Sequence, residues 1–403
     1  MTSIYGPVTD WATDFDHAEP EYNENLHAIW ADLRQRCPVA HTDRYDSTWL
    51  PVSHADVSAI ANDTEHFTSR GVVVSNLRPP ESAPIGGAPP ITSDPPFHHE
   101  ARRILLPAFS PKKIDPWADE IRALCRGLLA EMGDADIVDA GRQYAQHIPV
   151  NVIARMLGFP LEDADLFREF VHAVIEGVNV SAEERGNGEL GLDQYIDMQI
   201  ADHLGREDAD DLTSFLMNAE IFGQKLSHPH VRGTIILLLI AGIDTTWSAI
   251  GSALWHLAQH PEDRRRLRDE PELMPFAIEE FLRVYAPVTM ARLVAKDTEI
   301  GGCPVKTDEW VLLPFPAANL DPAVFDRAGE VLIDRQENRH LAFGLGIHRC
   351  IGSNLARLEL RIAVEEFLHH FPEFELDGTR PVTWSIGQIR GPRDLPIKVL
   401  PRT

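Results

Sequence analysis

The chain has 403 residues, of which 44% are apolar, and its 37 Lys and Arg against 62 Asp and Glu give a formal net charge of −25 at pH 7. This apolar content excludes an intrinsically disordered chain, which would lack the side chains to build a core. The acidic balance argues against a nucleic-acid binder, because neutralising phosphates needs a basic face. The four cysteines are far apart and form no CxxC pair, so no disulfide framework or zinc ribbon is predicted.

The expected location follows from what the N-terminus and the apolar runs contain. The first residues have no basic segment followed by an apolar core, so we expect no signal peptide. The longest apolar run, residues 235–243, is far short of the about 20 residues that span a bilayer. We therefore expect a soluble, cytoplasmic protein that does not bind a membrane.

In chain order, the first half is predicted to hold a long loop and then a series of helices. Residues 78–96 contain seven prolines and two glycines, and proline removes backbone donors and blocks helix formation. Both a flexible linker and a loop that covers a substrate fit such a segment. Apolar residues at spacings of three and four favour helices at 98–109, 115–132, 143–157, 163–178 and 209–219.

The second half contains the longest predicted helix. Residues 230–259 are almost uniformly apolar in their first half, and a helix that is apolar on all sides is a buried one. Gly302, Pro304, Val305 and the run at 310–313 predict short strands around a turn. The fold class is therefore predicted to be mainly α with a small β region.

A glycine-rich segment around Cys350 carries the sharpest chemical signal. Residues 343–352 read Phe-Gly-Leu-Gly-Ile-His-Arg-Cys-Ile-Gly, and an amphipathic helix follows at 354–364. The glycines permit turns that a Cβ would block and let a flat ligand come close. Cys350 would lie at a helix N-terminus, where N–H groups and the helix dipole stabilise a thiolate, a soft ligand for iron. Considered alone, it also fits a buried free cysteine.

The pattern Phe-x-x-Gly-x-x-x-Cys-x-Gly at 343–352 resembles the haem-binding loop of the cytochrome P450 family. The resemblance covers about residues 45–400 and implies a single haem domain over 1–403 with the cytochrome P450 fold. Haem b (iron protoporphyrin IX) would lie between the long central, oxygen-activating helix and the helix after the cysteine loop. Cys350 would be its iron ligand. The loop residues implied to contact the haem are Phe343, Gly344 and Gly352.

A charged pair before this loop also matches the family. Glu280 and Arg283 stand three residues apart on a predicted helix that ends at Pro287, so their charges share one face. Alone, such a pair is typical of a solvated surface. Placed before the cysteine loop, it resembles the core ion pair of the family, whose role is structural.

Polar residues interrupt the long apolar helix at 241–246, which reads Ala-Gly-Ile-Asp-Thr-Thr. Buried polar groups cost free energy unless they are partnered, and a helical Thr can bond the carbonyl four residues back. A satisfied polar insertion is therefore one interpretation. The resemblance implies an oxygen-activating stretch, with Ala241 against the haem, and Asp244 and Thr245 as the acid and alcohol that deliver protons to dioxygen. Thr246 is a weaker candidate.

The haem propionates need cationic or hydrogen-bonding partners. Residues 94–103 resemble the Asp-Pro-Pro-x-His-x-x-x-Arg segment of the family, and His98 and Arg102, four apart, share one helical face. The resemblance adds Arg292 and His348, and charge-assisted contacts from Arg to carboxylates suit this role. His99 and Arg103 point elsewhere and are expected at the surface.

The substrate pocket is predicted by aligning the same motifs. Its walls would come from the loops at 72–74 and 85–91, the central helix, and the segments 288–290 and 386–389. The individual residues named for it are Val73, Val74, Leu237, Val288, Thr289 and Met290. Because nearly all of these are apolar and Asp244 is the one fixed charge, we expect a small neutral substrate of aromatic type. Hydroxylation or O-dealkylation is the expected reaction.

Electrons from NAD(P)H would arrive through a ferredoxin-type or flavodoxin-type donor and its reductase. Residues 335–361 hold five Arg against Glu337 and Glu359, a basic island that fits an acidic donor or arises by chance. Residues 341–357 and 383–393 look closest to the haem domains of self-sufficient reductase fusions and their standalone relatives. Whether this chain is standalone or a truncated fusion stays open.

Two rival functions remain. A peroxide-driven haem-thiolate peroxygenase typically lacks the acid and alcohol pair, so Asp244 and Thr245 speak against it. A haem-based protein that binds gas or ligand without turnover has no need of a proton relay. Both are less favoured than a monooxygenase.

Overall fold

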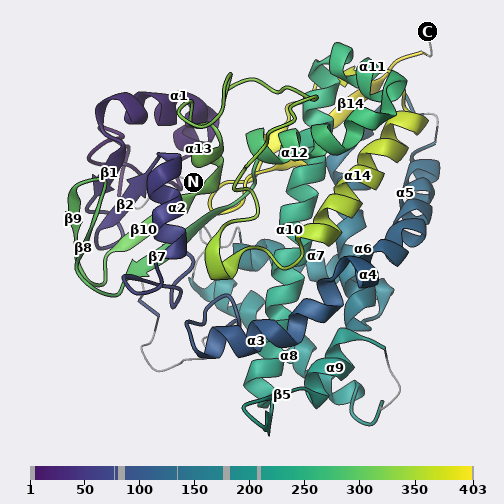
Figure 1. Cartoon of the computed structure of the whole chain (residues 1–403). Coiled ribbons are helices and arrows are strands. Elements are labelled where there is room, and N and C mark those ends of the chain that lie inside the picture. Colours follow the sequence, from purple (N-terminus) through teal and green to yellow (C-terminus); the bar gives the residue numbers. More distant parts are fainter. Residues whose placement is uncertain are drawn as a thin grey trace.

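The computed structural model describes residues 5–76, 78–79, 87–133, 135–175, 182–206 and 210–401, and of residues 171–175 and 182–190 only the backbone. A small sheet region occupies one side and helices fill the other (Figure 1). The helices are α1 (Pro20–Arg36), α2 (His54–Asn62), α3 (Phe97–Leu105), α4 (Pro111–Ile114), α5 (Ala118–Met132), α6 (His147–Leu157), α7 (Ala164–Ile175), α8 (Ala182–Asp202), α9 (Leu212–Asn218), α10 (His228–Gln259), α11 (Pro261–Asp269), α12 (Met274–Val284), α13 (Phe315–Asn319) and α14 (Ser353–His370). The predicted fold class, mainly α with a small β region, is confirmed.

The largest sheet has five strands in the order β1-β2-β10-β7-β3, with β2 and β10 parallel and the other pairs antiparallel. Smaller sheets are β11-β14-β4, β12-β13, β5-β6 and β8-β9. The strands are β1 (Val39–Thr42), β2 (Thr48–Pro51), β3 (Phe67–Thr68), β4 (Ile137–Asp139), β5 (Glu220–Ile221), β6 (Gln224–Lys225), β7 (Thr289–Val294), β8 (Thr298–Ile300), β9 (Cys303–Val305), β10 (Trp310–Pro314), β11 (Phe374–Leu376), β12 (Thr383–Trp384), β13 (Pro392–Asp394) and β14 (Pro396–Val399). The buried run at β10 is the strand that the sequence predicted.

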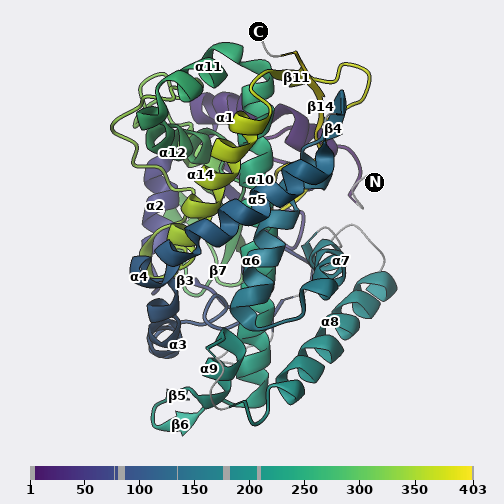
Figure 2. The same ribbon diagram turned by 90° about the vertical axis from the view of Figure 1, so that its right-hand side faces the viewer.

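Helix α10 is the centre of the helical part. It has 32 residues and packs against α6, α7, α8 and α14 (Figure 2). Its length and composition would also suit a membrane span, but 61% of its most apolar window is buried inside the molecule. The core helix of a soluble protein passes the same test, so this is weak evidence for a span. We treat α10 as the core helix that the sequence predicted.

Several predicted helix boundaries differ from the observed ones. The helix expected at 98–109 ends at Leu105 and continues as a 3-10 turn over Leu106–Phe109, because Pro107 has no N–H to donate. The helix expected at 143–157 begins at His147, after a π-helical turn at Gly141–Ala145. The last residue of the helix predicted at 163–178 and the first residue of the helix predicted at 209–219 lie outside the described residues.

The described part of the proline-rich segment runs over the central helix. Thr234 Oγ1 donates a 3.1 Å hydrogen bond to the Pro89 carbonyl, and a Cβ on Gly233 would lie 2.4 Å from the Gly87 oxygen. The backbone at Gly87 therefore lies too close to α10 for a larger residue to replace Gly233. For residues 87–96, this contact favours the covering loop over the flexible linker; residues 80–86 lie outside the described chain.

Candidate functional site

The cysteine loop is shaped by two glycines in left-handed backbone conformations. Gly344 and Gly346 have φ values of 65° and 64°, and a Cβ on Gly346 would lie 2.5 Å from the Ala61 carbonyl oxygen in α2. The Cys350 N–H donates a 2.8 Å hydrogen bond to the Phe343 carbonyl, which closes the loop. Helix α14 begins three positions later, so the cysteine lies just before a helix N-terminus, as the sequence predicted.

Opposing effects act on the Cys350 thiol. Its surface is accessible, yet the protein that surrounds it raises its pKa by desolvation. The Gly352 N–H and the guanidinium groups of Arg102 and Arg349 lower that pKa. Together with Arg357, these groups offset part of the desolvation, and the pKa of the free thiol stays above its ordinary value. Once a metal binds the sulfur, the thiolate is the form that remains.

Four polar side chains from distant segments meet beside this loop. His98 is on α3 and His348 in the cysteine loop, and their ring centroids are 4.3 Å apart. Arg292 on β7 is buried, and Arg102 on α3 donates to the Arg349 carbonyl. Both ring nitrogens of His98 are buried and have no hydrogen-bond partner among the described residues. Within the part of the chain that the structure describes, neither Arg102 nor Arg292 makes an ion pair.

The protonation of this cluster fits two carboxylates. Burial lowers the pKa of His98 to about 4, that of His348 to about 2 and that of Arg292 to about 10. At neutral pH the imidazoles are therefore neutral hydrogen-bonding groups, and the positive charge comes from Arg292 and Arg102. Two guanidiniums without carboxylate partners match the two propionates of a haem in charge and in chemistry. The residues present therefore fit the haem that the sequence implies.

The central helix has a row of accessible residues near its middle. Ala241, in the middle of this buried helix, is exposed, and Leu237 and Thr245, one turn to either side, are half-buried. Thr245 Oγ1 donates a 2.7 Å hydrogen bond to the Ala241 carbonyl. Because its proton is used in this way, the oxygen keeps its lone pairs for accepting a bond. Thr246, the weaker candidate, is buried.

Asp244 is buried and paired with an arginine that the sequence analysis did not identify. Its Oδ1 lies 2.7 Å from Nη2 of Arg393 on β13. The guanidinium of Arg393 lies 4.3 Å from the Trp247 ring centroid, and its Nη1 donates to Ser248 Oγ at 3.2 Å. The carboxylate is therefore held as an anion. No local sequence pattern signals this partner, because β13 joins α10 only through the tertiary fold.

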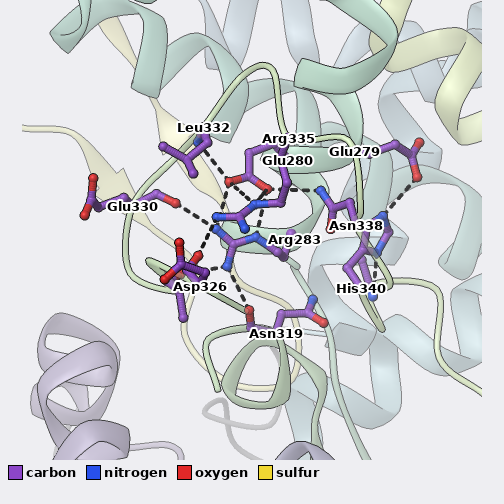
Figure 3. Close-up of polar contacts among 12 residues, drawn as sticks. Glu279, Glu280, Arg283, Asn319, Asp326, Glu330, Leu332, Arg335, Asn338 and His340 are labelled. Atoms are coloured by element: carbon purple, nitrogen blue, oxygen red, sulfur yellow. Dashed lines mark hydrogen bonds and ion pairs between the residues drawn. The ribbon is translucent and has the colours of Figure 1, made fainter. Parts of the chain in front are cut away.

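Glu280 and Arg283 form the centre of a buried polar cluster (Figure 3). Arg283 Nε and Nη2 each donate a 2.8 Å hydrogen bond to the Glu280 carboxylate, and both side chains are fully buried. Burial acts to raise the pKa of Glu280, but Arg283 and Arg335 hold it below its usual range. Further donors to this carboxylate are the Leu332 N–H and the Asn338 side chain.

Arg283 connects this cluster to the chain before the cysteine loop. Its remaining donors bond the carbonyls of Asn319, Ala328 and Glu330, at 2.9, 2.7 and 2.7 Å. Figure 3 shows these bonds converging on one guanidinium from several segments. The cluster thus fixes α12 against α13 and against the irregular segment that leads to Cys350.

The predicted pocket residues fall into two groups. Leu237, Val288, Thr289 and Met290 are half-buried. Val74 is buried in the apolar cluster of the five-stranded sheet, with Leu293 and Trp310, whereas its neighbour Val73 is 38% exposed. The segment 85–91 is described only from residue 87.

Gln388 connects the walls of this region. Its Nε2 donates to the Val72 carbonyl at 2.9 Å and lies 3.2 Å from Met290 Sδ. The main-chain carbonyl of Gln388 accepts a 2.9 Å hydrogen bond from the Thr289 N–H. The sequence analysis included Gln388 in the 386–389 wall without giving it a role. The structure makes it the link between three chain segments.

Comparison with known proteins identifies a family that this chain matches. Residues 190–388 match the family described as "Cytochrome P450". Nocardicin C N-oxygenase of Nocardia uniformis subsp. tsuyamanensis is 33% identical over 384 residues, 93% of this chain and 95% of that protein. Mycinamicin IV hydroxylase/epoxidase of Micromonospora griseorubida is 32% identical over 92% of this chain and 95% of that protein.

Solved structures agree with the fold. The structure of CYP109E1 from Bacillus megaterium, in complex with testosterone, has a TM-score of 0.86 and 29% identity, covering 94% of this chain and 99% of that one. The polyketide synthase cytochrome PksS from Bacillus subtilis has a TM-score of 0.86 and 30% identity, covering 96% of this chain and 99% of that one. The similarity thus extends over the whole arrangement of helices and sheets described above.

Proposed function

The chain belongs to the cytochrome P450 family and is a monooxygenase, and from this premise we propose that it inserts one atom of dioxygen into a small apolar substrate. We further propose that the chain forms a single haem domain over 1–403 and that the cofactor is haem b. When bound, this haem supplies the dioxygen activation and the oxygen insertion. The cluster of Arg102, Arg292, His98 and His348 beside Cys350 carries the proposal.

Each part of this cluster has its own task. Cys350 would provide a thiolate ligand to the iron. Arg102 and Arg292 would neutralise the two propionates, and His98 and His348 would donate hydrogen bonds to them. Ala241 would leave room for a flat ring beside α10, because a larger side chain would fill that space. Phe343, Gly344 and Gly352 would let the loop backbone lie close to that ring.

Asp244 and Thr245 are proposed to deliver protons. Thr245 Oγ1, which donates to the Ala241 carbonyl, would accept a hydrogen bond from water and so position the water that carries the proton. Asp244 is bonded to Arg393 and must exchange this partner for water, from which it takes up a proton, before it can pass a proton inward. Arg393 is then a positioning residue that holds the carboxylate at its resting position.

The substrate remains a proposal at the level of chemical class. We propose a small neutral compound of aromatic type, oxidised by hydroxylation or O-dealkylation, because Leu237, Val288 and Met290 are apolar and half-buried. The named relatives act on nocardicin C and mycinamicin IV, and one solved relative holds testosterone. Such different substrates on one fold mean that local side chains, and not the fold, set the choice.

The electron donor is proposed to be a ferredoxin or flavodoxin with its reductase, using NAD(P)H. Arg335 and Arg357 of the predicted basic island are used internally, by Glu280 and Glu279. Arg339 and Arg349 are exposed and available to an acidic partner. The resemblance to the haem domains of reductase fusions and the cytoplasmic location also stay proposals.

The proposed function is tested by a substrate titration followed by turnover. The ferric protein is titrated with aromatic ethers, small terpenoids, amino-acid derivatives and fatty acids while the Soret band is followed. We expect a low-spin to high-spin shift with aromatic ethers and product formation with NADPH, ferredoxin and its reductase. Product formation with peroxide alone, and none with the electron-transfer chain, would favour a peroxygenase instead.

A further inference from the structure

A second cluster of metal-binding side chains lies away from the haem region, at the corner between α10 and α11. His256 is in the last turn of α10, His260 is the residue between the two helices, and Asp263 is in the first turn of α11. One ring nitrogen of each histidine and one carboxylate oxygen of Asp263 lie within 4.8 Å of one another. Among the described residues, no other group of histidine, cysteine or carboxylate side chains meets this spacing.

The two imidazole rings are arranged to act together. They are stacked, with ring centroids 4.2 Å apart and an interplanar angle of 17°. Stacking places the two rings side by side, with one nitrogen of each ring and one Asp263 carboxylate oxygen within 4.8 Å of one another.

The Nδ1 atom of each ring already has an outer partner. His256 Nδ1 lies 2.9 Å from the Tyr285 hydroxyl, and His260 Nδ1 lies 3.2 Å from Glu262 Oε1. Metal-binding histidines usually make such a bond with the nitrogen that does not bind the metal, because it fixes the ring and its tautomer. His260 Nε2 is therefore left for a ligand, and His256 Nε2 can take one in exchange for its 2.9 Å contact with Asp263 Oδ2.

The charges around the corner favour a cation. The carboxyl end of α10 carries the negative end of the helix dipole, and Asp263 and Glu262 add two carboxylates. Arg264, in the first turns of α11, donates to the Glu373 carboxylate and to the Leu257 and Phe374 carbonyls.

We propose that His256 Nε2, His260 Nε2 and the Asp263 carboxylate form a binding site for a divalent transition-metal ion of the Zn²⁺ or Ni²⁺ type. Two imidazoles and one carboxylate are the ligands that these ions take, with water at the open position. Mg²⁺ and Ca²⁺, which prefer all-oxygen sites, would bind weakly. His260, which is exposed, gives the ion a path from solvent.

Metal binding replaces one existing contact. Without metal, His256 Nε2–H donates to Asp263 Oδ2 at 2.9 Å, and Nδ1 accepts from the Tyr285 hydroxyl. With metal, the proton leaves Nε2 through exchange with water and Nδ1–H donates to the Tyr285 oxygen. The ring stays neutral, and the metal takes the place of the Nε2 proton. The ion would then link α10 to α11 more firmly than the hydrogen bond does.

Equilibrium dialysis of the haem-loaded protein against ZnCl₂, with zinc and iron measured by mass spectrometry, tests this site. We expect about one zinc per chain beyond the iron, and a loss of affinity of about tenfold or more in His260→Ala and in Asp263→Asn. His369→Ala, an exposed histidine at the end of α14, is the matched control and should bind zinc as the wild type does. Zinc should raise the thermal midpoint of the wild type and not that of His260→Ala.

Several results would overturn the proposal. Equal zinc binding by the wild type and His260→Ala would place the zinc elsewhere. No zinc above background at micromolar concentration, in protein with full haem content, would mean that the corner only joins the two helices. A Soret change on adding zinc that parallels its binding would indicate a site beside the haem.

Discussion

A single side chain, Asp244, shows how a residue can be predicted while its setting cannot. The sequence motif at 241–246 predicts that Asp244 and Thr245 on the central helix are the acid and the alcohol of a proton relay. Arg393, which holds Asp244 at 2.7 Å, comes from a strand near the C-terminus and has no motif of its own. Cys350, by contrast, was predictable with its loop geometry, because glycine spacing and backbone conformation are local properties.

Replacing the acid or the alcohol tests the proton relay. In Asp244→Asn and in Thr245→Ala we expect turnover to fall by about 10²-fold and more of the NAD(P)H consumed to appear as peroxide, since positioned proton transfer contributes on this scale. Product formed per NAD(P)H oxidised is the measurement. Haem content should stay unchanged in both, and Thr245→Ser should recover most of the loss. Normal coupling in Asp244→Asn and Thr245→Ala would contradict the relay.

The environment of the Glu279 carboxylate predicts how the stability of the folded protein depends on pH. Burial acts to raise its pKa, but Arg357 and His340 lower it from an ordinary 4.5 to about 2. A group whose pKa is lower in the folded protein stabilises it above the ordinary pKa, and this contribution is lost as pH falls towards the folded value. Glu279 should contribute its full stabilisation of the fold above pH about 4.5 and none near pH 2.

Acid unfolding of Glu279→Gln measures this contribution. We expect the variant to be less stable than the wild type at pH 7, with the difference shrinking between pH 4.5 and 2. Glu337→Gln, at an exposed position nearby, should follow the wild type throughout. A constant difference between Glu279→Gln and the wild type down to pH 2 would contradict the assignment.

At the scale of elements, most helices and the short strands at 303–314 were predictable, and the pairing of strands into sheets was not. Helices α5 and α6 have apolar residues at helical spacing, α10 is apolar on nearly all sides, and the sequence analysis found all three. Helix α1 has a polar sequence with a backbone irregularity at Asn25, and α8 contains three glycines, so neither shows a strong period. The five-stranded sheet joins strands of two to six residues from distant parts of the chain, which no local pattern reveals.

The buried cluster around Glu280 makes a prediction for element packing. Glu280→Gln leaves Arg283 and Arg335 in the core without a carboxylate, which should cost about 3–5 kcal/mol of unfolding free energy. Urea unfolding followed by circular dichroism, together with haem content, is the measurement. A change below about 0.5 kcal/mol, typical of a surface substitution, would show that the cluster does not hold α12 to the cysteine loop.

At the scale of the whole molecule, composition predicted the class of protein and the motifs predicted its family. Net charge was less informative about the docking face, because the fold uses Arg335 and Arg357 internally. The sequence count of five arginines over residues 335–361 therefore overstates the positive charge offered to a partner. The folded structure is needed to tell which arginines pair inside the molecule and which are exposed to a partner.

Electron transfer tests the remaining docking face. In Arg339→Glu and Arg349→Glu we expect reduction by a ferredoxin to slow about tenfold at low ionic strength, with the difference shrinking as salt screens the charges. Stopped-flow reduction under carbon monoxide is the measurement. Arg265→Glu on α11 is the control. Equal rates in all three variants and the wild type would contradict docking at this face.

The most direct test of the account is the absorption spectrum of the reduced carbon monoxide complex, in the wild type and in Cys350→His. We expect the wild type to show the long-wavelength Soret band of thiolate ligation. Cys350→His should retain haem through Arg102, Arg292, His98 and His348 while its band moves to the shorter wavelength of histidine ligation. A thiolate spectrum that survives in Cys350→His, or is missing in haem-loaded wild type, would contradict the assignment of Cys350.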